Sequence, residues 1–193
     1  GDAKFRHSSN ESEVVKFYEL YDVMNGIEEY ELGLGYYDEE YSKKMQPLRD
    51  AYSEYVKETY LTVPGDLKEK LLAYMGEEAE NAKADYTVIP YILENNATYS
   101  LELDDLKWGE DYVEHFLFKE KKGYCSHFAT AATLMYRSVG IPARYAEGYL
   151  IAESDYKNKQ VDGDGYVEMT VQDSFAHAWP EIYLQGVGFM PVE

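Results

Sequence analysis

The chain has 193 residues, of which 45% are hydrophobic, so it is long enough for one sizeable core and too apolar for a disordered chain. It carries 18 basic and 37 acidic residues, and this net charge of −19 argues against nucleic acid or an anionic membrane surface as a direct partner. No apolar run approaches the roughly 18 residues that a membrane span needs, and no signal peptide pattern is present, so we expect no direct membrane insertion by this sequence.

The first 64 residues are expected to form a helical N-terminal segment without a chemical motif. Residues 1–10 are polar and predict a disordered start. Apolar residues then recur at helical spacing over residues 11–30 and 38–60, with an interruption at Gly33 and Gly35. Two roles fit such helices, an interaction surface or a cap over the rest of the chain, and we favour the cap.

A break at Val63, Pro64 and Gly65 separates this segment from a second domain, residues 65–193. Asp66 is suited to cap a helix that runs to about residue 81, and a shorter helix is expected over residues 85–95 in spite of Pro90. Residues 97–103 alternate like a strand. Residues 106–123 then lead into the segment that carries the only cysteine of the chain.

Cys125 stands at the start of a predicted helix. Apolar residues recur at helical spacing after it, and the pattern stops at Gly140, which precedes Pro142 and an extended segment. The N-terminus of a helix carries about half a positive charge and unpaired N–H groups, which favour a thiolate and can bind an oxyanion. Cys125 is therefore a candidate nucleophile, and the alternative is a buried, inert cysteine.

A base and an orienting carboxylate for this thiol occur near the C-terminus. His177 lies on a predicted strand over residues 175–184, and a glycine-bearing turn over residues 185–188 leads to a returning strand over residues 189–193. This hairpin brings Glu193 within diagonal cross-strand reach of His177. A nucleophile, a base and an orienting acid together form the arrangement that cysteine acyl-transfer enzymes use.

His127, His115 and the Asp-Gly repeat are poorly suited to act as a base for the thiol or as metal ligands. His127 follows Cys125 by two residues, and side chains at that helical spacing point about 200° apart, so it is a poor base for the thiol. His115 stands beside an apolar run and is expected to be a surface or core histidine. The Cys125–His127 pair lacks further zinc ligands, and the Asp-Gly repeat at residues 162–165 lacks the ligand series of a calcium loop, which favours a hairpin turn. We therefore expect no metal and no cofactor.

The motifs around these residues form a recognisable series. It comprises Gly123, Tyr124 and Cys125 at the helix start, Gly140 to Arg144 with Gly148 and Tyr149, His177, Ala178 and Trp179 with Glu181, Tyr183 and Leu184, and finally Pro191, Val192 and Glu193. This series resembles that of the transglutaminase-like superfamily. The resemblance covers about the last 130 residues and is strongest from Phe116 onward.

The resemblance implies an α+β fold with a papain-like or transglutaminase-like core, in which the nucleophile helix packs on an antiparallel sheet, preceded by N-terminal helices. By analogy, Cys125 is the nucleophile, His177 the base, and Glu193 the third member, where the family usually has an aspartate. The oxyanion hole would combine the Cys125 N–H with an upstream side chain, for which Tyr99 and Trp108 are candidates.

Two further roles are expected near these residues. Trp179 would shield the Cys–His pair from water. Arg144 would pair with an acid as a structural partner and would not act as a substrate clamp.

The resemblance also implies cysteine-dependent acyl transfer on protein or peptide amides through a thioester. Water as the acceptor makes the chain a peptidase or amidase, whereas a lysine amine makes it a cross-linking transglutaminase. Hydrolysis is slightly favoured, because no amine-binding motif is evident.

Bacterial relatives of this type imply an extracytoplasmic domain of a larger, membrane-anchored protein. The alternative reading of the whole chain is a non-catalytic protein-binding or cell-wall-binding module that retains the fold.

Overall fold

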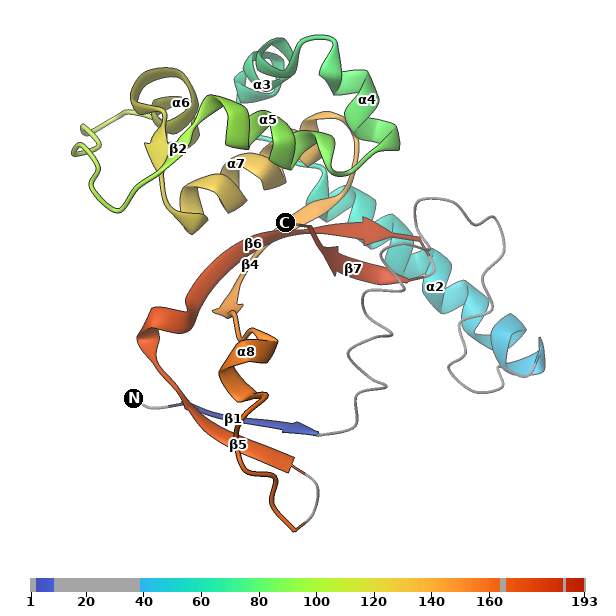
Figure 1. Cartoon of the computed structure of the whole chain (residues 1–193). Helices are drawn as coiled ribbons and strands as arrows, with labels where there is room; N and C mark the ends of the chain where they lie inside the picture. The colour runs from blue at the N-terminus through green and yellow to red at the C-terminus, as the bar shows by residue number, and fades with distance from the viewer. Residues whose placement is uncertain (1–2, 9–38, 164–165, 186, 193) are drawn as a thin grey trace. The chain divides into compact units, whose positions relative to one another are not determined.

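The structure, a computed structural model, describes residues 3–8, 39–163, 166–185 and 187–192. It combines helices and sheets (Figure 1) and divides into two compact units, one of Gly1–Tyr37 with Gly148–Ala176 and one of Asp38–Glu147 with His177–Glu193. The domain boundary after residue 64 stays a prediction, and the helix predicted over residues 11–30 lies outside the described residues.

Helices make up the first part of the larger unit. The prediction of a helix over residues 38–60 is confirmed by α2 (Glu39–Tyr60). Three shorter helices follow, α3 (Leu67–Met75), α4 (Glu78–Ala84) and α5 (Val88–Asn96). Pro90 fits into α5 because it lies in the first turn, where the missing N–H has no helical partner to lose.

The prediction of one helix from Asp66 to about residue 81 is wrong. Helix α3 ends at Gly76, whose φ of 57° is an angle that glycine adopts without steric cost, and the chain turns there before α4 begins. Asp66 does precede α3, but its side chain makes no capping hydrogen bond. Periodicity alone therefore joined two helices that one glycine separates.

The segment before the cysteine is less regular than predicted. The strand expected over residues 97–103 is limited to β2 (Thr98–Tyr99), which pairs in parallel with β3 (Lys122–Gly123). Between them lie a loop, the short helix α6 (Tyr112–Glu114) and a six-residue π-helix, η1 (His115–Glu120). Asp111 caps α6, because its carboxylate accepts hydrogen bonds from the N–H groups of Val113 and Glu114, each at 2.9 Å.

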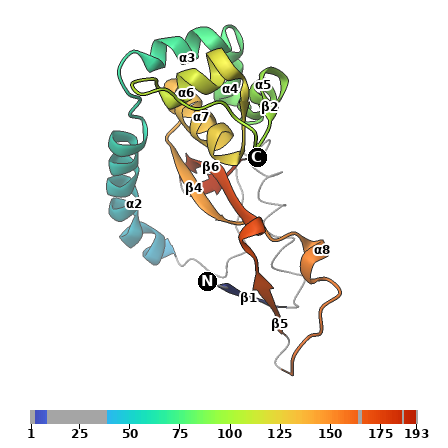
Figure 2. The same cartoon turned by 90° about the vertical axis from the view of Figure 1, so that its left-hand side faces the viewer.

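The prediction of a helix that begins at the cysteine is confirmed by α7 (Cys125–Ser138), which lies beside α3 and α5 in both views of the molecule (Figures 1 and 2). It ends before Gly140, and Arg137 ties this end to the next strand by donating from Nε to the Ala143 carbonyl at 2.7 Å. The hydrophobic core gathers around α7. It includes Leu71, Ile89, Leu93, Ala131, Ala132, Met135, Tyr136, Ile182 and Val192.

A three-stranded sheet carries the C-terminal motifs. Its strands are β4 (Ala143–Tyr149), β6 (Ala176–Leu184) and β7 (Gly188–Pro191), in the order β4-β6-β7. Strands β6 and β7 pair antiparallel, from Glu181 opposite Pro191 to Leu184 opposite Gly188, so the predicted hairpin is confirmed. Because Ile182 of β6 shares the core of α7, the α+β class with a nucleophile-bearing helix packed on a sheet is confirmed.

The smaller unit contains a two-stranded antiparallel sheet. Strand β1 (Ala3–Ser8) pairs with β5 (Tyr166–Val171), from Ala3 opposite Val171 to Ser8 opposite Tyr166. The expectation of a disordered start is therefore wrong for residues 3–8. The backbone groups of β5 need partners, and composition around residue 5 carries no information about a strand some 160 positions later.

The connection between β4 and β5 contains a further helix, the short α8 (Glu153–Tyr156). No helix in the described ranges has both the length and the apolar character that a membrane crossing requires.

Candidate active site

Cys125 occupies the first position of α7, as the sequence predicted. The preceding residue, Tyr124, has an extended backbone with φ −114° and ψ −175°, so the chain enters the helix directly at the cysteine. The Cys125 side chain is partly buried. It therefore lies where the unpaired N–H groups of the helix start are concentrated.

Close packing explains why a glycine precedes this position. A Cβ atom on Gly123 would lie 2.6 Å from Cβ of His127 and 2.8 Å from the ring of Phe116, distances that real Cβ atoms do not show. The His127 ring also stacks on the ring of Tyr112, with centroids 4.5 Å apart. Gly123 thus allows β3 to pass close to the first turn of α7.

His127 is a structural residue in this turn. Its side chain is buried, and Nδ1 accepts a long hydrogen bond from the Tyr124 N–H at 3.4 Å. Burial lowers the pKa of His127, because removal from water disfavours the charged imidazolium. The sequence argument that His127 is a poor base agrees with this position.

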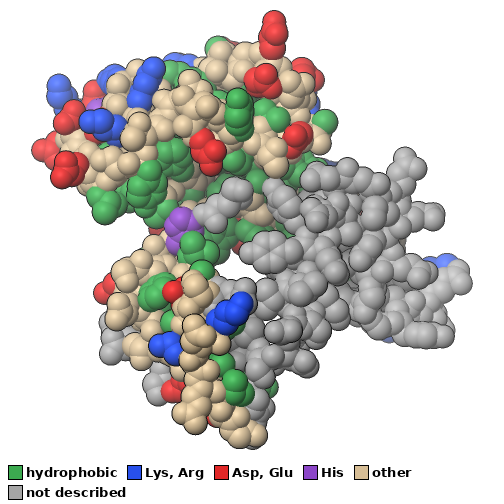
Figure 3. Space-filling model, viewed as in Figure 1, with side chains coloured by type: hydrophobic (Ala, Val, Ile, Leu, Met, Phe, Trp, Pro, Cys, Tyr) green, Lys and Arg blue, Asp and Glu red, His purple; other side chains and the backbone are tan. Residues whose placement is uncertain are grey.

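Cys125 and His177 line one pocket of about 410 Å³. Helix α7 contributes the first of these residues and strand β6 the second. The remaining lining is mostly apolar, and Figure 3 shows hydrophobic side chains gathered on the larger unit over the region of α7 and β2. The apolar lining comprises Pro90, Leu93, Ala97, Phe128, Ala129, Ala132, Ala178, Pro180 and Val192. A thiol and an imidazole thus open into a common, largely apolar space.

The other predicted site residues have different positions. Tyr99 lines the pocket, and its ring stacks on that of Phe128 with centroids 6.2 Å apart. Trp108 is fully exposed and is not among the residues that line this pocket. Glu193 lies outside the described residues, so its place in a triad stays a prediction.

Trp179 belongs to a polar network behind His177. Its ring stacks on the His177 ring with centroids 6.2 Å apart, and its Nε1 donates to Oε1 of Glu181 at 3.3 Å. Oε2 of the same carboxylate accepts from Nε of Arg144 at 2.6 Å. The guanidinium also lies over the ring of Phe189, 4.2 Å from its centroid. Arg144 is therefore the structural partner of an acid, as expected, and the network holds the strand that carries His177.

Two tyrosines near the cysteine were missed by the sequence argument. The Tyr145 hydroxyl, on β4, donates to Glu147 at 2.5 Å, and the hydroxyls of Tyr112 and Ser126 lie 3.2 Å apart. Burial raises the pKa of both tyrosines, because removal from water disfavours the charged phenolate. The signal for Tyr145 was its place directly after the Gly140–Arg144 motif.

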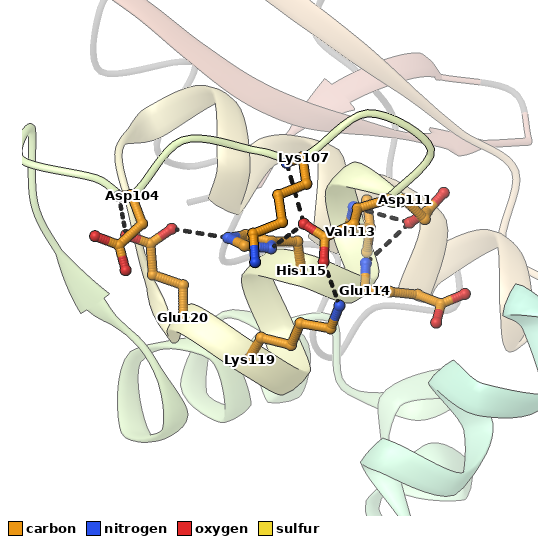
Figure 4. Close-up of polar contacts among 9 residues, drawn as sticks. Asp104, Lys107, Asp111, Val113, Glu114, His115, Lys119 and Glu120 are labelled. Carbon is orange, nitrogen blue, oxygen red and sulfur yellow. Dashed lines mark hydrogen bonds and ion pairs between the residues drawn. The ribbon is translucent and has the colours of Figure 1, made fainter.

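His115 is held in a charged cluster with two glutamates (Figure 4). Its Nδ1 lies 3.2 Å from Oε2 of Glu110 and its Nε2 lies 3.3 Å from Oε2 of Glu120, although neither contact has the angle of a hydrogen bond. The cluster also binds the preceding loop, because Glu120 accepts from the Asp104 N–H at 2.7 Å and Glu110 from the Lys107 N–H at 3.1 Å.

This cluster lies apart from the pocket lining and is not arranged to bind a metal. Among the described residues, no group of three or more His, Cys, Asp or Glu side chains is placed to hold a metal ion. His115 is therefore a partly buried structural histidine, as the sequence favoured.

Comparison with known proteins agrees with this geometry. Residues 69–193 match the family described as the Transglutaminase-like superfamily. The chain is 34% identical over 139 residues to YebA of Bacillus subtilis (strain 168), an uncharacterized protein, an alignment that covers 69% of this chain and 18% of that protein. It is 30% identical over 99 residues to a protein-glutamine gamma-glutamyltransferase of Pseudomonas aeruginosa, covering 51% of this chain and 14% of the relative.

A solved structure shows the same fold. The periplasmic domain of TgpA from Pseudomonas aeruginosa superposes with a TM-score of 0.53 at 25% sequence identity, over 72% of this chain and 48% of that domain. The chain spans less than a fifth of the length of the two curated relatives and about half of the solved domain. With the family match extending over almost two thirds of its length and including both Cys125 and His177, the chain belongs to the transglutaminase-like superfamily.

Proposed function

We propose that this chain catalyses cysteine-dependent acyl transfer on protein or peptide amides through a thioester. The observation that carries the proposal is that Cys125 and His177 open into the same pocket, the first from the start of α7 and the second from β6. A nucleophile and a base drawn from separate elements, with apolar walls around them, meet the requirements of covalent catalysis.

The reaction runs in two halves. His177 takes the thiol proton while the Cys125 sulfur attacks the amide carbonyl carbon, and the resulting oxyanion is held by the Cys125 N–H at the helix start. His177 then returns the proton to the leaving nitrogen, the C–N bond breaks, and a thioester remains on Cys125. Between the two side-chain candidates for the oxyanion hole, Tyr99 is favoured over Trp108, because Tyr99 lines the pocket.

The imidazole needs an orienting group, and two sources act together in this proposal. Glu193 holds the tautomer of His177 as the third member of a triad. The Trp179–Glu181–Arg144 network supports the strand from behind. On this basis Glu193→Gln lowers turnover less than loss of Cys125 does.

The acceptor decides the product. Water releases the acyl group and gives a peptidase or amidase, and a primary amine gives a new amide bond and releases no acid. Hydrolysis is the simpler second half, since it needs no second binding site. Cross-linking is the second candidate, favoured by the name of the Pseudomonas relative, a protein-glutamine gamma-glutamyltransferase.

We further propose a protein or peptide substrate and an extracytoplasmic location, as part of a larger protein with flanking membrane-anchored domains. The similarity to a periplasmic domain supports the location. The small share of each curated relative that the chain covers supports a larger parent protein. The rival function is a non-catalytic module that binds protein or cell-wall polymer and keeps the fold.

An acyl-trapping experiment separates the proposal from its rival. The protein is incubated with p-nitrophenyl acetate and intact mass is followed with time, with and without a primary amine such as cadaverine. An enzyme gains one acetyl group that Cys125→Ala lacks, and then loses it to water or, faster, to the amine. Acetylation that is absent, or that is unchanged in Cys125→Ala, would favour the binding module.

A further inference from the structure

The pocket of Cys125 contains one carboxylate among otherwise apolar walls. Glu94, on α5, is the only acidic residue among the described residues that line it. Its side chain is exposed at the surface of α5, while its neighbours Ile92 and Leu93 are buried in the core. A single fixed charge therefore borders the space that the thiol and the imidazole share.

Glu94 also lines a second, adjoining pocket of about 440 Å³, and Pro90 is likewise common to both. The other two carboxylates of this second pocket already have partners. Glu78 accepts a hydrogen bond from the Asn81 amide at 2.8 Å. Asp85 accepts from the hydroxyl of Thr87 at 2.6 Å and from its N–H at 2.9 Å, and these bonds lower the pKa of Asp85.

Glu94 differs from these two, because its carboxylate makes no hydrogen bond or ion pair within the described part of the chain. Its charge thus remains available to an incoming group. Neutral and cationic groups can approach it, whereas an anion meets repulsion beside the thiol.

We propose that Glu94 is a specificity-determining residue that binds a cationic group, an ammonium or a guanidinium, of a substrate entering the Cys125 pocket. This inference rests on the proposed function of the pocket. The cation has two possible sources with the same chemistry, a basic residue of the acyl donor beside the reacting amide or the amine of the acceptor.

The test uses the single cysteine of the chain as a reporter and needs no known substrate. Three methanethiosulfonates are compared, one neutral (methyl), one cationic (trimethylammonium-ethyl) and one anionic (sulfonatoethyl). Each forms a mixed disulfide with Cys125 and releases methanesulfinate. In the parent protein we expect the cationic reagent to react faster than the anionic one. Glu94→Gln should lower this ratio by about threefold, and Glu94→Lys should lower it further.

The matched control is Glu69→Gln, which removes the same charge from an exposed position on α3 that lines neither pocket. It corrects for the general attraction of a protein with a net charge of −19. A ratio that Glu94→Gln leaves unchanged, or that Glu69→Gln lowers equally, would overturn the proposal. Raised salt should reduce the difference between parent and Glu94→Gln, because it screens exposed charges.

The test of Glu94 and the test of the proposed function use different readouts, so either can fail without the other. The rate with the neutral reagent, compared between parent and His177→Ala, reports the activated thiol, whereas the ratio of charged reagents reports Glu94. With a turnover assay, the two sources of the cation are then told apart. A rise in KM in Glu94→Gln for a lysine-containing donor but not for its norleucine analogue identifies the donor, and a rise in the KM of the amine identifies the acceptor. An unchanged KM in both arms would contradict the proposal.

Discussion

The larger unit uses histidine and glutamate in two regions with opposite properties. In the Cys125 pocket, a histidine and a glutamate border an apolar space that holds a thiol. In the His115 cluster, the ring nitrogens of a histidine lie 3.2 and 3.3 Å from carboxylate oxygens of two glutamates, and both carboxylates also accept backbone hydrogen bonds from the preceding loop.

The difference lies in what the polar groups face. The cluster includes Glu120, whose side chain is 8% exposed, and the groups of this cluster face one another. In the pocket the lining leaves room for a substrate, and the carboxylate of Glu94 is available to it. Polar groups that bind each other hold the fold, whereas polar groups that face an open apolar space are placed to act on a ligand.

The largest effect is expected from the nucleophile. Cys125→Ala should abolish acyl transfer, because no other thiol exists in the chain to form the thioester. Its unfolding transition should match that of the parent, since the partly buried side chain contributes little packing. Turnover and thermal unfolding of the two proteins check this, and residual turnover near the parent rate would place the chemistry elsewhere.

No side chain should be tolerated at position 123, where β3 passes close to the first turn of α7. Gly123→Ala is expected to lower the free energy of unfolding by about 1–3 kcal/mol, because the new Cβ would overlap His127 and Phe116. Gly163→Ala is the matched control, since a Cβ there has no atom of the described residues within 4 Å. Urea unfolding measures both variants. Equal stability of Gly123→Ala and the parent would mean that the first turn of α7 relaxes freely.

The network behind His177 offers a comparison between two ion pairs. Glu181→Gln should lower both the free energy of unfolding, by about 1–3 kcal/mol, and the rate of acyl transfer, because Arg144 and Trp179 lose a charged partner. Glu114→Gln is the control. It removes the ion pair in which Nζ of Lys70 lies 2.7 Å from Oε1 of Glu114, and it changes no residue that lines the pocket. We expect it to leave the rate unchanged. Equal rates for both variants would show that the network does not position His177.

A smaller effect is expected when the pH is lowered, and it concerns the His115 cluster. Lys119 and the Lys107 N–H lower the pKa of Glu110 to about 2 from its ordinary 4.5. A carboxylate with a lowered folded pKa contributes stability that is present above pH 4.5 and lost as the pH falls toward about 2. Below pH 4.5 the protection factor of the Lys107 amide, the exchange rate of an unstructured peptide at the same pH divided by that of this amide, should therefore fall progressively.

Glu110→Gln is the control for this acid response. The protection factor of its Lys107 amide should be lower throughout and should lack the change between pH 4.5 and 2. A Lys107 amide that stays equally protected in the parent across this range would show that the cluster does not hold the loop.

Much of this architecture could be predicted from local pattern. The start of α7 at Cys125, its end before Gly140, and the hairpin of β6 and β7 follow from periodicity and glycine positions. The placement of His177 in the same pocket as the thiol could be predicted only by resemblance, since the two residues come from distant segments.

Other features depend on contacts that no local pattern encodes. The pairing of β1 with β5 joins two segments that lie far apart in the sequence, and the split between α3 and α4 depends on the backbone angle of Gly76. Tyr145 and Glu94 belong to no sequence motif. The structure identifies Tyr145 by its raised pKa and Glu94 by its position in the lining of the pocket. Trp108 looked suitable by residue type, yet it lies fully exposed and away from the pocket lining.

The central claim is that Cys125 and His177 act as a pair, and the pH dependence of iodoacetamide alkylation tests it most directly. An isolated thiol reacts in proportion to its thiolate fraction, so its alkylation rate has a midpoint at about pH 8.5. We predict that the parent already reaches a reactive plateau well below pH 8, and that His177→Ala loses this plateau and reacts like an ordinary thiol. A single ordinary profile, identical in the parent and in His177→Ala, would contradict the account.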